Sequence, residues 1–230
     1  MGLDTEDYAS YSLLRELVAR LGGTDLTDKK GTILFADNFE SPTLSWTWST
    51  GGNAYWTYDY NLFLSGSRSL KCVTDTDGGV SIMRYYPLPP SKRIGLSLLF
   101  GSPSSGTKLS LESWYHEGTV YMHAGVKIHF NTSTVWLTQT GIGDIEILTL
   151  EGFNTGISCF YPLKLVVDFA KRKYQRLIIG FEEYDISAYD ILYLPYPIYN
   201  QLTLAVSVTP QLHIGGSVNI DDSVLTYSEP

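Results

Sequence analysis

From Gly31 onward, the residues follow a period of two. Short runs rich in Tyr, Trp, Thr, Val and Ile are separated by clusters of Gly, Pro, Asn, Asp and Ser. Such alternation is typical of strands, because successive side chains of a strand face opposite sides of the sheet. No segment of helical periodicity lies among these runs, so we predict an all-β, antiparallel two-sheet sandwich. The expected strands are 32–36, 69–74, 94–100, 108–116, 119–130, 134–138, 145–150, 163–169, 174–179, 202–208 and 218–226.

The clearest predicted hairpin spans residues 108–130. A tight turn at Glu117 and Gly118 would pair Trp114 with Tyr121 and Glu112 with His123. These four paired side chains then lie on one face, and the apolar ones point to the core. The residues predicted to face the core are Val120, Met122, Ala124, Val126, Ile128 and Phe130.

Residues 1–30 differ from the rest, because they hold ten of the charged side chains and show helical spacing. Ser12 can cap a short helix, and two glycines at 22 and 23 can end it. We therefore expect a helical appendage over 1–30 and a sandwich domain over 31–230. A helix of about ten residues is marginal alone, so its apolar stripe must dock on its own domain or on a neighbouring subunit. The stripe consists of Leu13, Leu14, Leu17, Val18 and Leu21.

Charge and cysteine content exclude several classes of function. The 230 residues carry 16 Lys and Arg against 24 Asp and Glu, a net charge of −8. Nucleic acids and anionic membranes are therefore not expected partners, since both need clustered basic residues. Cys72 and Cys159 form no zinc-ligand spacing, so free thiols are expected. No basic and apolar leader opens the sequence, so we expect synthesis in the cytosol or a mature fragment.

Four blocks of sequence resemble the concanavalin-A-like, laminin-G-type jelly roll. They are 34–40 (LFADNFE), 66–71 (GSRSLK), 163–187 and 218–225 (VNIDDSVL), and they occur in the order in which this family has them. The resemblance implies a jelly-roll sandwich in which the first and last strands pair. The family includes lectins and carbohydrate-binding modules.

The combination of an N-terminal helix with such a sandwich also resembles structural proteins of bacteriophage virions. This second resemblance implies a capsid decoration or tail-associated protein that assembles in the host cytoplasm. Capsid or tail subunits, further copies of the same chain and a surface glycan are then the expected partners. The alternative is a carbohydrate-binding module of a secreted protein, and a third is the relic of a glycoside hydrolase or lyase.

The jelly-roll resemblance also implies a structural calcium ion. Many family members hold one where the first and last strands meet, which here points to Glu40, Asp221 and Asp222 as ligands. Carboxylate oxygens suit calcium because it is a hard cation. The alternative is that Glu40 is a turn carboxylate and the two aspartates form an edge pair.

Two aromatic groups are candidate ligand-binding surfaces, since aromatic rings stack on sugars or form interface hot spots. Trp114, Tyr121 and His123 form one group, and Trp56 with Tyr58 forms the other. The alternative is that about half of these rings lie in the core. Tyr193 and Tyr196 belong to a Pro- and Tyr-rich loop that suits contact with a partner subunit or covers one sheet end.

Catalysis is not expected from the sequence. Retaining glycosidases of the resembled fold carry a Glu-x-Asp-x-x-Glu motif with two catalytic carboxylates. This chain offers only Asp144 and Glu146 around Ile145. We therefore predict a non-catalytic structural protein with a lectin-like jelly roll that binds partner subunits and, as a further expectation, glycans.

Overall fold

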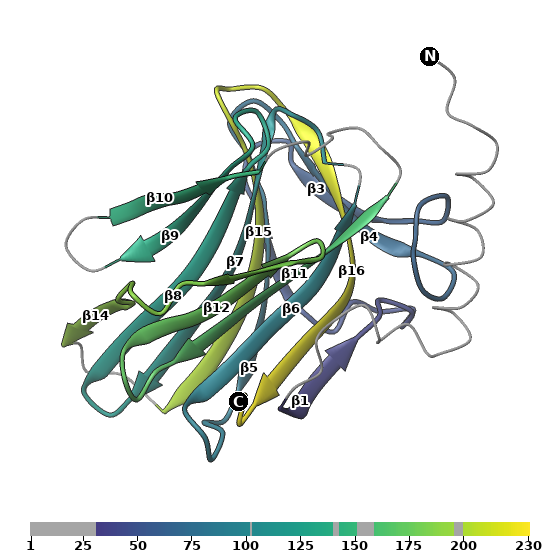
Figure 1. Ribbon diagram of the computed structural model, residues 1–230. Coiled ribbons are helices and arrows are strands. Elements are labelled where there is room, and N and C mark those ends of the chain that lie inside the picture. The colour runs from purple at the N-terminus through teal and green to yellow at the C-terminus, as the bar shows by residue number, and fades with distance from the viewer. Residues whose placement is uncertain (1–30, 102, 140–142, 151–158, 196–199) are drawn as a thin grey trace.

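The computed structural model describes residues 31–101, 103–139, 143–150, 159–195 and 200–230. Within these residues it shows sixteen strands in two eight-stranded sheets, with antiparallel pairing between neighbours. The two sheets pack as two layers, with β1 near one edge of the view and β10 near the other (Figure 1). The predicted all-β jelly-roll sandwich is confirmed. The described residues hold no helix with the length and apolar character that a membrane crossing requires.

Sheet A has the order β13-β12-β11-β6-β16-β4-β3, and β1 also pairs with β16. Its strands are β1 (Thr32–Asp37), β3 (Tyr55–Asp59), β4 (Ser69–Thr74), β6 (Arg93–Gly101), β11 (Phe160–Asp168), β12 (Lys173–Ile179), β13 (Glu182–Asp185) and β16 (Gly216–Tyr227). Because β16 pairs with β4 in its first half and with β1 in its second, one edge of this strand serves two partners. The expected pairing of the first and last strands is therefore present.

Sheet B has the order β10-β9-β8-β7-β15-β5-β2, and β14 also pairs with β8. Its strands are β2 (Thr47–Thr50), β5 (Val80–Tyr86), β7 (Thr107–Glu117), β8 (Val120–His129), β9 (Thr134–Gln139), β10 (Gly143–Thr149), β14 (Leu192–Pro195) and β15 (Gln201–Pro210). Strand β8 likewise serves two partners along one edge, with β14 over residues 120–123 and β9 over residues 126–129.

The core lies between the two sheets and follows the predicted alternation. On β8, Met122, Ala124, Val126 and Ile128 are buried among apolar neighbours, whereas the side chains between them lie on the outer face of sheet B. Burial of apolar surface is the main stabilising contribution in such a sandwich. The alternation therefore fixes which side chains of sheet B remain available to a ligand.

The register of the β7–β8 hairpin differs from the prediction by two residues. Trp114 pairs with His123, and Glu112 pairs with Gly125. The turn lies one position later than expected because Gly118 has a φ of 60°, a left-handed conformation that glycine adopts without strain. A shift of two keeps every side chain on its predicted face, since the period of a strand is two.

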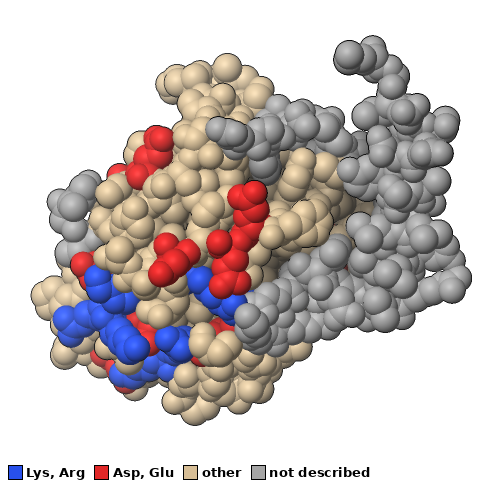
Figure 2. Space-filling view, viewed as in Figure 1, with Lys and Arg blue, Asp and Glu red and all other residues tan. Residues whose placement is uncertain are grey.

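The outer face of sheet A carries a buried ion-pair cluster near the last residues of the chain. The Oε1 atom of Glu229 lies 2.8 Å from Nζ of Lys164 on β11, and its Oε2 atom lies 3.1 Å from Nη2 of Arg176 on β12. The side chains of Glu229 and Lys164 are 0% and 2% exposed. Figure 2, drawn from the same side as Figure 1, shows Lys and Arg atoms gathered toward one end of the visible face with Asp and Glu atoms among them. The positive charges on this face are therefore partly balanced by neighbouring negative charges.

Candidate functional site

The outer face of sheet B brings together the first predicted aromatic group. Trp114 on β7 and His123 on β8 are cross-strand partners, and their rings stack with centroids 5.1 Å apart. The ring of Tyr121 lies 6.3 Å from that of His123. Burial raises the pKa of Tyr121, although a hydrogen bond from Trp114 opposes this effect. The phenol is therefore protonated at neutral pH and can donate a hydrogen bond.

Glu112 and His123 form a carboxylate–imidazole pair beside these rings. Nε2 of His123 lies 3.3 Å from Oε2 of Glu112, and the two side chains are only 12% and 14% exposed. The atoms lie within ion-pair distance, but the buried Nε2 makes no hydrogen bond to the described residues. A carboxylate beside Nε2 favours the tautomer that carries its hydrogen on Nε2, which leaves Nδ1 as the ring nitrogen that can act as a proton acceptor.

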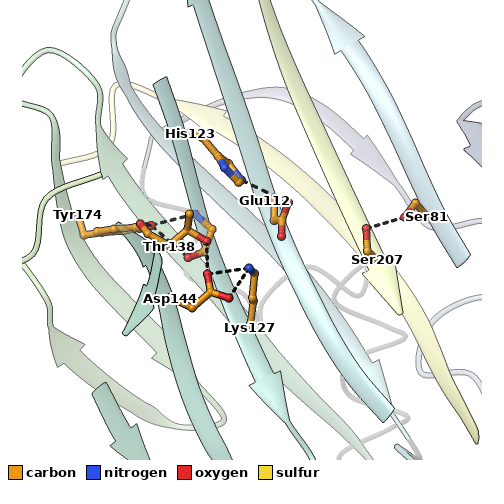
Figure 3. A network of polar contacts seen from close by, with 9 residues as sticks. Ser81, Glu112, His123, Lys127, Thr138, Asp144, Tyr174 and Ser207 are labelled. Atoms are coloured by element: carbon orange, nitrogen blue, oxygen red, sulfur yellow. Dashed lines mark hydrogen bonds and ion pairs between the residues drawn. The ribbon is translucent and has the colours of Figure 1, made fainter. Parts of the chain in front are cut away.

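Gly125 lies beside this pair, between the part of β8 that pairs with β14 and the part that pairs with β9, and Glu112 and Thr138 pack where a side chain would otherwise lie. A Cβ atom on Gly125 would lie 3.0 Å from Cγ of Glu112 and 3.4 Å from Oγ1 of Thr138. Tyr174 of sheet A crosses the core to this point (Figure 3). Its hydroxyl accepts a hydrogen bond from the Gly125 amide at 3.0 Å and donates to the Thr138 carbonyl at 2.7 Å. Backbone groups that β9 leaves without a strand partner are thus satisfied from the opposite sheet.

Lys127 and Asp144 form a second charged pair beside Thr138. Nζ of Lys127 donates to both carboxylate oxygens of Asp144 at 2.7 Å, and the Thr138 hydroxyl donates to Oδ1 at 3.2 Å. Burial raises the pKa of Asp144, but the hydrogen bond and charge of Lys127 outweigh burial, so its pKa is lowered. Asp144 is therefore ionised and already engaged at neutral pH.

Trp56 and Tyr58, the second predicted aromatic group, lie elsewhere. They are on β3 at the edge of sheet A, opposite the core residues Cys72 and Leu70, and both pack partly against the core. The guanidinium of Arg68 sits 3.8 Å from the centre of the Tyr58 ring. These rings are thus not part of the surface that Trp114 occupies.

The aspartates predicted to bind calcium lie at a bulge in β16. Oδ2 of Asp221 accepts hydrogen bonds from the amides of Leu64 and Ser65 at 2.9 and 3.1 Å, and Oδ1 accepts one from the amide of Asp222. Burial raises the pKa of Asp221 to about 7, and the charge of Asp222 adds to this effect. Burial and the charge of Glu40 raise the pKa of Asp222 to about 6 against the opposing hydrogen bond of Ser65.

The oxygens of this cluster are mostly taken by donors from the protein. Oε1 of Glu40 accepts from the amides of Ser67 and Arg68, and Oε2 accepts from the Ser67 hydroxyl. Only the buried Oδ2 of Asp222 accepts no hydrogen bond from the described residues. Calcium takes six to eight oxygen ligands, and the described part of the chain has no group of three or more His, Cys, Asp or Glu that could hold a metal ion. Most of these oxygens thus already accept hydrogen bonds from the chain, and calcium binding stays a prediction.

The predicted interface residues are only partly described. Tyr193 lies on β14, and the guanidinium of Arg172 sits 3.8 Å from the centre of its ring. Tyr196 lies outside the described residues, as does the predicted helical appendage of residues 1–30. The residues of its apolar stripe, Leu13, Leu14, Leu17, Val18 and Leu21, therefore lie outside them too. The predicted docking surface stays a prediction.

Sequence reasoning missed three parts of this site: the close approach of Glu112 and Thr138 to Gly125, the Tyr174 hydroxyl beneath it, and the pairing of Lys127 with Asp144. A signal for the first was present, because an isolated glycine inside a strand pattern indicates a bulge or a close approach of backbone or side chains. The other two depend on contacts between strands that the alternation pattern does not specify.

Comparisons with known proteins agree with this architecture. No protein-family model matches the sequence, and no curated protein sequence does. Among solved structures, an endo-β-1,4-glucuronan lyase from the fungus Trichoderma reesei superposes with a TM-score of 0.57 at 8% identity, over 86% of this chain and 96% of that one. The chain has a concanavalin-A-like jelly-roll fold. At this level of identity, the likeness establishes the fold alone.

Two further structures are similar in the same way. A GlcNAcα1-4Gal-releasing endo-β-galactosidase from Clostridium perfringens gives a TM-score of 0.53 at 10% identity, over 89% of this chain and 65% of that one. The laminarinase catalytic domain from Thermotoga maritima gives 0.51 at 10% identity, over 88% of this chain and 100% of that one.

These neighbours contradict the prediction that the protein is not an enzyme. All three carry the names of enzymes that cleave glycans, and one of them is a lyase rather than a hydrolase. The prediction used the missing Glu-x-Asp-x-x-Glu motif as an argument against any chemistry. A missing motif excludes only the mechanism that uses it, because one fold can carry several kinds of site.

Proposed function

We propose that the protein binds a polysaccharide on the outer face of sheet B. The observation that carries the proposal is the cluster of Trp114, Tyr121 and His123 beside Glu112. Flat rings on a sheet face can cover the apolar C–H face of a sugar, and the adjacent carboxylate of Glu112 can accept hydrogen bonds from sugar hydroxyls. The jelly-roll neighbours named for glycan-cleaving enzymes support this reading.

The face is long enough for several sugars. A row of polar side chains runs across it from Asp144 on β10 through Lys127 and Glu112 to Ser207 on β15 and Ser81 on β5. The two serine hydroxyls lie 2.8 Å apart and are hydrogen-bonded to each other. From β10 to β5 there are five strand spacings, roughly 24 Å at about 4.8 Å each. An oligosaccharide laid across the strands can thus contact side chains from most of the sheet.

A second candidate function is cleavage of the bound glycan, favoured by the Glu112–His123 pair. Hydrolysis by two carboxylates is not favoured, because Asp144 is held by Lys127. Elimination fits better. His123 takes the proton from the carbon beside a sugar carboxyl group, and the electron pair left behind forms a carbon–carbon double bond. The bond to the leaving oxygen breaks, and that oxygen takes a proton from Tyr121.

The binding proposal is tested by affinity electrophoresis of the protein through gels containing different soluble polysaccharides. Trp114→Ala is expected to lose most retardation while its thermal midpoint stays within a few degrees of wild type. Trp48→Ala is the matched control, because this tryptophan is 52% exposed and belongs to β2, away from the ring cluster. Equal retardation of wild type and Trp114→Ala would exclude this face as the binding site.

Cleavage is tested by incubating the retained polysaccharide with the protein and following two products separately. Elimination gives chain ends with a new double bond that absorbs ultraviolet light, whereas hydrolysis gives saturated ends. His123→Ala is expected to abolish the ultraviolet signal and to keep binding. Saturated ends from wild type, or an unchanged rate in His123→Ala, would show that the pair does not act as described.

The virion role predicted from the sequence is compatible with a glycan-binding face but does not depend on it. It needs residues 1–30 and Tyr196, which lie outside the described residues. Electron microscopy of particles carrying the gene for this chain tests it directly. Absence of the protein from purified particles would favour the secreted alternative.

A further inference from the structure

Lys108 is a cation on the proposed binding face to which no carboxylate of the described residues is bonded. It lies on β7, directly opposite His129 of β8. The β7 residue that pairs with Lys127 is two positions farther along, so the two lysines lie on the same face. Its side chain is partly buried, yet no hydrogen bond or ion pair links its ammonium to any residue that the structure describes. A lysine that lies along a sheet with its ammonium at the surface is a ready donor for an anion.

The surroundings of Lys108 sharpen this observation. Burial lowers the pKa of Lys108, and repulsion from Lys127 lowers it further, while the charges of Asp144 and Glu112 only partly oppose these effects. Both carboxylates are already engaged: Asp144 holds Lys127 at 2.7 Å, and Glu112 faces His123. Among the described residues, Asp144 is thus bonded to Lys127, and no carboxylate is bonded to Lys108.

We propose that Lys108, together with Lys127, forms an anion subsite and that the polysaccharide bound on this face carries sugar carboxylates. This inference rests on the proposed function and names its substrate class. One carboxylate oxygen of the sugar would accept a hydrogen bond from the ammonium of Lys108. Lys127 would contribute its positive charge while remaining bonded to Asp144. A charge-assisted hydrogen bond of this kind is roughly twice as strong as a neutral one.

The signs of the charges on the face point to a uronate rather than to a densely charged polyanion. Glu112 and Asp144 lie beside the two lysines, and Glu146 lies opposite Trp136 farther along the same face. Closely spaced sulfates or phosphates would meet these carboxylates and be repelled. A uronate chain carries one carboxylate per sugar and free hydroxyls between, so it can place anions on lysines and hydroxyls on carboxylates.

The test uses one polymer in two forms: a polyglucuronate and its carboxyl-reduced, neutral counterpart. Binding of the full chain to each is measured by isothermal titration calorimetry. Wild type is expected to bind the polyuronate at least about tenfold more tightly than the reduced polymer. Lys108→Gln is expected to lose this preference, and Lys108→Arg to retain most of it.

Two controls separate a local site from general effects. Lys171→Gln makes the same change of charge at a turn lysine that is 68% exposed, and it is expected to bind like wild type. The thermal midpoint of Lys108→Gln is expected to be no lower than that of wild type, because the lysine charge is unfavourable in this position. An equal loss in Lys171→Gln would overturn the subsite and assign the effect to net charge.

The remaining outcomes distinguish this inference from the proposed function. Equal binding of both polymers, abolished by Trp114→Ala, would overturn the anion subsite and support glycan binding on this face. Tighter binding of a sulfated polysaccharide without uronates, such as dextran sulfate, than of the polyuronate would overturn the preference for carboxylates. A lack of binding to either form of the polymer would count against both proposals.

Discussion

Gly125 and Tyr174 are the residues on which the shape of the candidate site depends most. The glycine leaves room for Glu112 and Thr138, and the tyrosine hydroxyl satisfies the backbone beneath it. They lie 49 positions apart and in different sheets. A period-two pattern assigns each of them to a face but says nothing about a contact through the core, so this part of the site could not be predicted from the sequence.

Tyr174→Phe tests the hydrogen bonds that the Tyr174 hydroxyl makes with Gly125 and Thr138. The substitution keeps the buried ring and removes the hydroxyl, which leaves the Gly125 amide and the Thr138 carbonyl buried without this partner. We expect a loss of about 1–3 kcal/mol in the free energy of unfolding, measured by urea denaturation. Tyr184→Phe is the control, since that hydroxyl contacts an exposed Glu182, and its effect should be within about 0.5 kcal/mol. Equal losses in the two variants would argue against a special role for Tyr174.

The bulge of β16 predicts an unusual response of stability to pH. The pKa values of Asp221 and Asp222 are raised to about 7 and 6 in the folded protein, whereas an unfolded aspartate titrates near 4. Between these values the folded state binds more protons than the unfolded state, so this contribution to stability is largest in acid and is lost as pH rises from about 4 to 7. His116 and His129, whose pKa values are lowered by burial, act in the opposite direction.

Asp222→Asn isolates the contribution of the bulge from that of the histidines. We expect the variant to be more stable than wild type by about 1–3 kcal/mol at pH 8, with a difference that shrinks toward pH 4.5. The measurement is the urea midpoint at three pH values. Asp185→Asn, a change at an exposed carboxylate whose pKa is lowered, should show no such gain. A variant less stable than wild type at pH 8 would contradict the account.

A calcium ion bound at the bulge would be detected by the effect of a chelator on the thermal midpoint. If a calcium ion is bound here, a chelator lowers the thermal midpoint of wild type and has no effect on Asp222→Asn. The account based on protons alone predicts no effect of chelator on either protein, because most carboxylate oxygens at the bulge already accept hydrogen bonds from the chain. A midpoint that falls with chelator in wild type alone would establish the ion and replace the proton account.

Glu229 follows β16 and bonds to side chains on β11 and β12, beyond the adjacent strand β6. Its carboxylate lies between the buried ammonium of Lys164 and the guanidinium of Arg176. Glu229→Ala should cost about 3–5 kcal/mol of stability, because it removes the buried counter-charge of Lys164. Urea denaturation measures this loss. The double variant Lys164→Met with Glu229→Leu should recover much of it, and a double variant as unstable as Glu229→Ala would show that geometry rather than charge is responsible.

Taken across both sheets, the fold was more predictable than the site. Alternation indicated the sandwich and the outward faces, and Trp114, Tyr121 and His123 lie together as predicted because a two-residue error in register leaves faces unchanged. The same pattern could not show that Trp56 and Tyr58 pack partly against the core, since half-buried rings on an edge strand alternate in the sequence in the same way as exposed rings. The argument against catalysis failed for another reason, since it rested on the absence of one motif.

Tyr174 belongs to sheet A and its hydroxyl is hydrogen-bonded to sheet B. The stability of one sheet is therefore coupled to that of the other through this hydroxyl oxygen. A glycan that orders β8 beside Gly125 also stabilises the hydroxyl that holds it, and through it β12 on the far side of the core. Hydrogen–deuterium exchange should therefore slow at amides of β12 when the outer face of sheet B is occupied. In Tyr174→Phe the slowing should be confined to sheet B.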